Sequence, residues 1–179
     1  MIYLLTTPPN TLEAKGRALG NYPSHLNSAS RKHLREVSAP LKDKEIKFAY
    51  ASDTDAEALH IVADELHVPF SKEYGLRRFN CGKQHGAKLD HLQGILEQLI
   101  QKWKKNADIP IRNGDSWRSV EKRLFKTVDQ IMAKEESAVI VTDSRTASLI
   151  VYRHPKALVM NGEALKPAKI YVIGKKQGN

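Results

Sequence analysis

Hydroxyl and carboxylate side chains directly follow two short apolar runs of the chain, residues 2–5 and 138–141. The first run is followed by Thr6 and Thr7, and the second by a threonine and Asp143. Such groups could support one reaction, in which Asp143 takes the proton of the Thr7 hydroxyl and the oxygen attacks an electrophile. An aspartate has a low pKa in water, so it is a weak base unless it is strongly desolvated. The pair alone therefore does not predict a catalyst.

The turn after the first run is also a poor site for an anion. Two consecutive prolines follow Thr7, and neither has the backbone N–H that a phosphate-binding loop offers. Glu13 and Asp143 would repel a phosphate dianion unless Arg78 or Arg145 lies beside them. These residue types argue against phosphate binding here.

The elements that would position these groups alternate between strands and helices. Short apolar runs predict strands, and apolar residues at helical spacing predict helices. Ser52 or Asp53 is expected to cap the second helix, and Asp115 or Ser116 the fourth. The predicted order is strand 2–5, helix 28–37, strand 46–50, helix 54–66, extended segment 68–70, helix 89–104, a capped helix ending near 132, strand 138–141, helix or turn 146–152, and strands 157–160 and 170–173.

This alternation predicts an α/β fold, a three-layer α/β/α sandwich around a mostly parallel central sheet. Ligands bind such sheets beyond the carboxyl ends of the strands, which places the candidate site near Thr7 and Asp143. No repeat, low-complexity tract or linker divides the sequence, and its length suits one unit. Residues 1–179 are therefore expected to form a single domain.

The composition, with 41% hydrophobic and 27% charged residues, excludes collagen-like, disordered and membrane-spanning classes. The apolar N-terminal run is too short for a signal peptide or a membrane helix. A single cysteine excludes an internal disulfide and fits a reducing compartment. A cytoplasmic protein with no membrane partner is the expectation.

The net charge of +9 favours anionic partners or serves solubility alone. Basic residues gather between positions 102 and 126, interleaved with Trp103, Trp117 and Phe125, as in surfaces that track nucleic acid. Alternatively, Trp103 belongs to a core and the cations form a solvated helix face. No recognised nucleic-acid module accompanies the segment. Its basic residues are Lys102, Lys104, Lys105, Arg112, Arg118, Lys122, Arg123 and Lys126.

No metal or other cofactor is predicted. The seven histidines lack the spacing of a ligand set, so surface side chains are expected. Asp53 and Asp55 could hold Mg²⁺, but helix capping and the preference for acids in a first helical turn explain them more simply. Cys81 is expected to be an unreactive buried thiol, although cationic neighbours in the sequence would lower its pKa.

Five short blocks occur in order along almost the whole chain. They are the strand before Thr6 with Gly16-Arg17 and Gly20, Ala51-Ser52-Asp53, Leu76-Arg77 with Phe79, Gly82 and Gly86, Gly114-Asp115-Ser116, and Val139–Thr142. Together they resemble the histidine phosphatase superfamily, which includes phosphoglycerate mutases and broad-specificity phosphatases. The resemblance implies the three-layer fold of that family.

The same resemblance implies a catalytic set that this chain does not have. The family uses a histidine nucleophile, two arginines on the phosphoryl oxygens, an asparagine, an acidic proton donor and a second histidine. In that order of roles, the aligned positions hold Thr7 for the nucleophile, Thr6 and Ala56 for the arginines, Glu13, Arg78 and Asp143. A shift of one residue in the second helix puts Asp55 or Glu57, neither of them cationic, in place of Ala56.

Phosphoryl transfer depends on positioned cations that stabilise oxygen charge, and these positions hold none of the family's cations. The hypothesis is a catalytically inactive histidine phosphatase-like protein that acts by binding a protein or an anionic ligand, with a homodimer as one option. The alternatives are a divergent phosphatase or hydrolase that reuses the cleft, and a nucleic-acid-binding protein. The candidate ligand-binding residues are Thr7, Arg17, Ser52, Arg78, Asp143 and Arg145.

Overall fold

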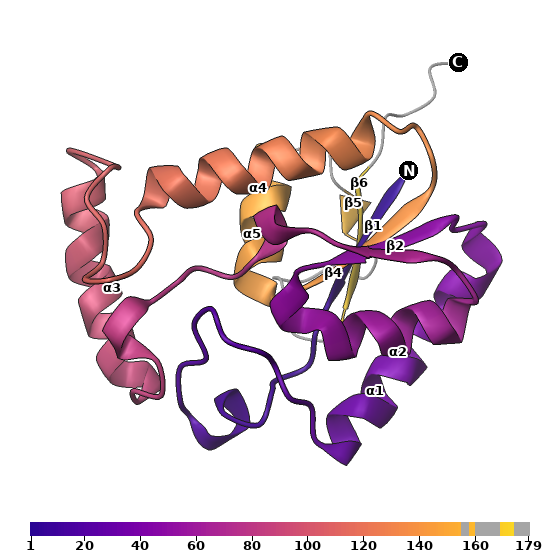
Figure 1. Ribbon diagram of the computed structural model, residues 1–179, viewed down its shortest axis with the longest axis horizontal. Helices are drawn as coiled ribbons and strands as arrows, with labels where there is room; N and C mark the ends of the chain where they lie inside the picture. The colour runs from indigo at the N-terminus through magenta and orange to yellow at the C-terminus, as the bar shows by residue number, and fades with distance from the viewer. Residues whose placement is uncertain (155–157, 160–168, 174–179) are drawn as a thin grey trace.

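The computed structural model describes residues 1–154, 158–159 and 169–173, and within them the chain forms a six-stranded sheet (Figure 1). The strand order is β3-β2-β4-β1-β6-β5. The first four of these pair in parallel, whereas β6 runs antiparallel to both β1 and β5. The strands are β1 Ile2–Thr6, β2 Phe48–Ala51, β3 Phe70–Lys72, β4 Ala138–Thr142, β5 Leu158–Val159 and β6 Ile170–Ile173.

Helices cover both faces of the sheet. Alternate residues of a strand point to opposite faces. Leu5 and Val141 pack in the core under α1 (Ser28–Ser38) and α2 (Ala56–Leu66). Leu4 and Ile140 pack in the opposite core with α4 (Trp117–Met132) and α5 (Ser144–Arg153). The predicted three-layer α/β/α sandwich with a mostly parallel sheet is confirmed.

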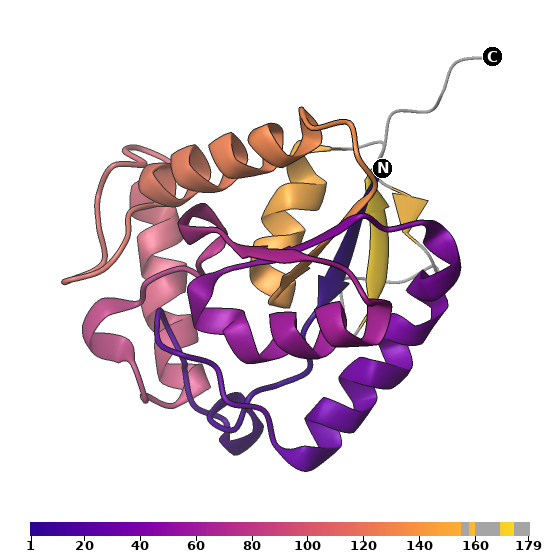
Figure 2. The ribbon, with the colours of Figure 1, turned by 45° about the vertical axis from the view of Figure 1, so that its right-hand side comes forward.

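The helix α3 (Leu89–Trp103) lies apart from the sheet, near one end of α4 (Figures 1 and 2). Its buried residues Leu92 and Leu99 join a third, small apolar cluster with Ala18, Cys81 and Ile111. This helix therefore covers the loops that leave the sheet and not the sheet itself. No helix among the described residues is long and apolar enough to span a membrane.

Several element boundaries differ from the predicted ones. The predicted helix at residue 54 begins with a 3-10 turn over Asp53–Asp55, because the Ser52 side chain caps that turn by accepting from the Asp55 N–H. The α5 helix begins at Ser144, where the Asp143 side chain caps it. Of the predicted strand 157–160, positions 157 and 160 lie outside the described residues.

A reciprocal cap fixes the start of α4. The Ser116 hydroxyl accepts from the Ser119 N–H at 3.1 Å, and the Ser119 hydroxyl accepts from the Ser116 N–H at the same distance. We expect Ser116→Ala to lower the free energy of unfolding by about 1 kcal/mol, because one helix N–H loses its acceptor. Urea unfolding measures the change. The control Ser148→Ala removes a hydroxyl inside α5 and should cost less, and equal losses would contradict a capping role.

Candidate functional site

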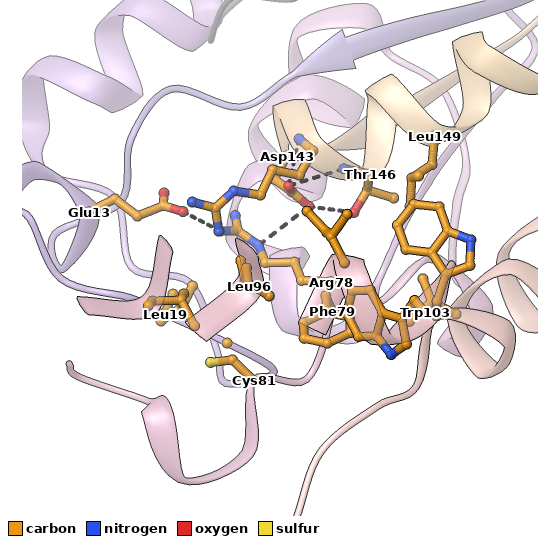
Figure 3. A pocket seen from close by; sticks show the side chains of 16 residues that line it. Glu13, Leu19, Arg78, Phe79, Cys81, Leu96, Trp103, Asp143, Thr146 and Leu149 are labelled. Atoms are coloured by element: carbon orange, nitrogen blue, oxygen red, sulfur yellow. Dashed lines mark hydrogen bonds and ion pairs between the residues drawn. The ribbon is translucent and has the colours of Figure 1, made fainter. Parts of the chain in front are cut away.

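The Arg78 guanidinium lies among three carboxylates at the carboxyl ends of the strands, those of Asp55, Glu13 and Asp143. Figure 3 shows Arg78 with Glu13 and Asp143. One terminal nitrogen donates to Asp55 Oδ1 at 2.8 Å, and the other to Glu13 Oε1 at 3.1 Å. The Nε atom lies 4.0 Å from Asp143 Oδ2 and has no hydrogen-bond partner among the described residues. Because the Arg78 side chain is only 6% exposed and that of Asp55 is fully buried, water screens this pair poorly.

The carboxylates of the cluster stabilise the positive charge of Arg78. Burial alone would lower the pKa of Arg78, but the carboxylates of Asp55, Asp143 and Glu13 outweigh it and raise that pKa above its ordinary value. Arg78 is therefore a permanent cation. With three carboxylates around one guanidinium, the formal charge of the cluster is negative.

Separate turns aim the carboxylates at Arg78. Asp55 is held in the turn after β2, where the Ser52 hydroxyl donates to Asp55 Oδ2 at 2.8 Å. Glu13 begins a 3-10 turn in the loop after β1, and Asn10 orients it by donating to Glu13 Oε2 at 2.6 Å. The buried Asn10 also accepts from the Glu13 N–H. Sequence analysis missed Asn10, although an asparagine after two prolines is a signal for such a side-chain-stabilised turn.

Asp143 is used as a helix cap. It follows β4 directly, and its Oδ1 accepts from the N–H groups of Arg145 and Thr146. Its Oδ2 accepts the Thr146 hydroxyl at 2.6 Å. These hydrogen bonds fix the carboxylate at the start of α5. Among the described residues, none joins Asp143 to the Thr7 hydroxyl.

Arg123 holds the segment that carries Arg78. Its guanidinium donates to the carbonyls of Gly75, Arg77 and Arg78, and to the Asp115 carboxylate at 3.0 Å. The side chain is 18% exposed, so these bonds are largely shielded from water. The contact with α4 is close, since a Cβ at Gly75 would lie 1.9 Å from Thr127 Oγ1 on that helix. The predicted solvated helix face is therefore wrong for Arg123.

The other predicted residues lie at different places around the cluster. Thr7 is buried and lines a small cavity of about 220 Å³ together with Asp143 and Arg145. Ser52 is fully buried behind Asp55, and Ala56 opens α2 with no polar side-chain group.

Arg17 is exposed and is not among the residues that line this cavity. Its guanidinium donates to the Gly86 carbonyl at 2.7 Å, which ties the loop after β1 to the loop before α3. Thr6, at the end of β1, has its hydroxyl bonded to the backbone of Lys169.

A second cavity, which we call the aromatic cavity, adjoins the cluster. It has a volume of about 190 Å³ and lies between α3, α4 and α5. Glu13, Arg78 and Asp143 close one end, while Trp103, Leu96 and Leu149 are among its apolar walls (Figure 3). Sequence analysis treated Trp103 as core, because helical periodicity does not separate a cavity wall from a packed interior.

The side chains that could ligate a metal ion and the thiol of Cys81 are not arranged for such chemistry among the described residues. No group of three or more His, Cys, Asp or Glu side chains suited to a metal occurs in the part of the chain that the structure describes. Asp53 pairs with Arg77, and this bond lowers the pKa of Asp53. The Cys81 thiol is buried, and burial raises its pKa, which leaves less of the reactive thiolate at neutral pH.

Most of the chain matches a known protein family. The family model of the histidine phosphatase superfamily (branch 1) matches residues 9–174. The chain belongs to the histidine phosphatase superfamily. The match begins at Pro9, so it leaves out Thr6 and Thr7 themselves. No curated protein matches the chain by sequence.

Solved structures agree with this fold at low sequence identity. A phosphoglycerate mutase from Bacillus anthracis str. Sterne is 19% identical with a TM-score of 0.73, over 97% of this chain and 90% of that one. YhfR of Bacillus stearothermophilus is 20% identical with a TM-score of 0.72, over 86% and 79%. The α-ribazole phosphatase from Shigella flexneri is 15% identical with a TM-score of 0.69, over 85% and 78%.

Proposed function

We propose that this member of the histidine phosphatase superfamily is not a phosphatase or mutase and acts by binding a ligand or a protein partner, a second copy included. The observation that carries the proposal is the Arg78 cluster. The guanidinium that an anion would need is already paired with Asp55 and Glu13. A phosphate dianion would also meet the Asp143 carboxylate, so electrostatic repulsion opposes its binding.

The residue types around the site support the same proposal. Of the described residues that line the cavity beside Thr7 and the aromatic cavity, none is a histidine, so no imidazole is available there as a nucleophile on phosphorus. The resemblance assigns the two catalytic imidazoles to the positions of Thr7 and Asp143. Thr7 lacks a hydrogen-bonded base among the described residues, and Asp143 is used in capping α5. These arrangements disfavour a divergent hydrolase.

Nucleic-acid binding has weaker support. The indole N–H of Trp103 donates to the Ile109 carbonyl at 2.6 Å, and its ring packs against Trp117. Both rings line the aromatic cavity, so they do not form an exposed platform for bases. Arg118 is paired with Asp108 at 3.1 Å. Apart from Arg123, the basic residues of this segment are therefore better described as a solvated surface.

The proposal predicts that the chain turns over no phosphate monoester. With p-nitrophenyl phosphate at high protein concentration, we expect the rate to equal that of a buffer blank. Titration calorimetry with orthovanadate should give no binding heat, because the Arg78 cluster repels the anion. The control Thr7→Ala should behave like the natural chain. Turnover that disappears in Thr7→Ala, or vanadate binding that Thr7→Ala abolishes, would overturn the proposal.

A further inference from the structure

The aromatic cavity has the features of a ligand site that the Arg78 cluster does not share. Its apolar walls come from different elements: Phe79 from the segment after Arg78, Trp103 from α3, Trp117 from α4 and Leu149 from α5. A pocket with apolar walls and a few polar groups at one end is typical of small-molecule sites. Its volume of about 190 Å³ exceeds the roughly 150 Å³ of a cavity that binds benzene.

The walls of the cavity present aromatic rings to a ligand, and the indole N–H of Trp103 is not available to bind it. The Trp103 N–H is already bonded to the Ile109 carbonyl, so the indole meets a ligand with its carbon framework. The ring centroids of Phe79 and Trp103 are 5.8 Å apart in an edge-on arrangement, and those of Trp103 and Trp117 are 5.9 Å apart. Aromatic rings pack favourably at this spacing, so an aromatic ring of a ligand can pack against these walls in the same way.

The charged end of the cavity selects against a charged ligand. Its charged lining residues are two carboxylates, Glu13 and Asp143, and two guanidinium groups, Arg78 and Arg145. Glu13 and Arg78 are paired with each other, and Asp143 accepts three hydrogen bonds at the start of α5. Among these described groups, the Arg78 Nε–H is the buried donor without a hydrogen-bond partner, and a neutral ligand oxygen can accept from it. A charged head group would lose its hydration beside groups of both signs, because the carboxylates repel an anion and the guanidinium groups repel a cation.

We propose that the aromatic cavity binds an uncharged, mainly aromatic small molecule of one or two fused rings. The inference rests on the proposed function, because a phosphate ester in this fold would need the anion site that the Arg78 cluster occupies. It goes further by naming the chemical class of the ligand. The Glu13–Arg78–Asp143 end then serves as a polar stop against which a hydroxyl or carbonyl of the ligand can lie.

Three probes with one ring system and different charges test the proposal. These are 1-naphthalenemethanol, naphthalene-1-sulfonate and 1-naphthylmethylammonium, each titrated by calorimetry into the full chain. We expect the neutral alcohol to bind at least about tenfold more tightly than either ion, because only the ions lose hydration without compensation. The chain has two tryptophans, and both line the cavity, so both indole N–H signals should shift in a nuclear magnetic resonance titration.

Matched variants locate the binding. Leu96→Phe and Leu149→Phe each enlarge a partly buried wall residue and should weaken binding of the alcohol at least about tenfold by filling the cavity. Leu66→Phe makes the same change at a partly buried position of α2, away from the cavity, and should leave binding unchanged. Thermal unfolding confirms that each variant is folded.

Four results would overturn the inference. They are binding of an ion as tightly as the alcohol, no binding of any probe, unmoved indole signals, or undiminished binding in both folded cavity variants. None of these would restore phosphatase activity, so they leave the proposed absence of catalysis standing. Turnover of p-nitrophenyl phosphate would instead remove the proposed function, whatever the naphthyl probes show.

Discussion

Arg78→Met should lower the free energy of unfolding by about 3–5 kcal/mol at neutral pH, the usual cost of removing one partner from a buried ion pair. Methionine keeps much of the length of the side chain but leaves Asp55, Glu13 and Asp143 facing one another without a cation. The unpaired Asp55 carboxylate contributes most to this loss of stability, because its side chain is fully buried and cannot be hydrated.

Urea unfolding of the variant, followed by tryptophan emission and by circular dichroism, measures this loss. The double variant Arg78→Met/Asp55→Asn provides the control, because it removes the stranded buried charge. We expect it to regain part of the loss, with a coupling energy on the order of 1–3 kcal/mol. A loss below about 1 kcal/mol for Arg78→Met, or no recovery in the double variant, would show that the cluster is not held together by charge.

Arg123→Met is expected to have the second largest effect, with a loss of about 2–4 kcal/mol of unfolding free energy. Hydrogen bonds to charged groups contribute about 1.5–3 kcal/mol each, and this guanidinium donates to three carbonyls and one carboxylate. The loss also frees the segment that presents Arg78 to the carboxylates. The variant should therefore also weaken binding of 1-naphthalenemethanol, since Phe79 and Arg78 both line the aromatic cavity.

Arg118→Met is the matched control for Arg123→Met. Both residues lie on α4, but the Arg118 side chain is 61% exposed and its partner Asp108 is 65% exposed. An exposed ion pair of this kind contributes about 0–1 kcal/mol, so Arg118→Met should be nearly neutral in the same unfolding experiment. Equal losses in the two variants would mean that the carbonyl contacts of Arg123 do not hold the Arg78 segment.

The layers of the fold could be predicted because their signals are local. The runs at residues 2–5 and 138–141 are apolar at every position, as expected of strands covered on both faces, and they pair in parallel as β1 and β4. That pairing brings Thr7 and Asp143 to one end of the sheet, where both line the same small cavity. The rule that ligand sites form beyond strand ends therefore located this part of the site.

The ion pairs of Arg78 and the carbonyl contacts of Arg123 could not be predicted, because they join residues far apart in the sequence. Arg78 and Glu13 are 65 positions apart, and no local pattern indicates that they pair. Arg123 follows the helical spacing of an exposed basic face, yet it reaches backbone carbonyls of a loop some 45 positions earlier. The aromatic cavity could not be predicted for a different reason. A periodic pattern indicates which residues are apolar, but it does not indicate what they pack against.

The sharing of one guanidinium by three acids has an evolutionary consequence. Replacing Arg78 alone would leave three carboxylates without their cation, whereas replacing Glu13 or Asp143 alone leaves the buried Arg78–Asp55 pair in place. Chains that lose Arg78 first would therefore be less stable than chains that first lose one of these two acids. The cluster thus constrains the order in which single mutations could exchange its residues.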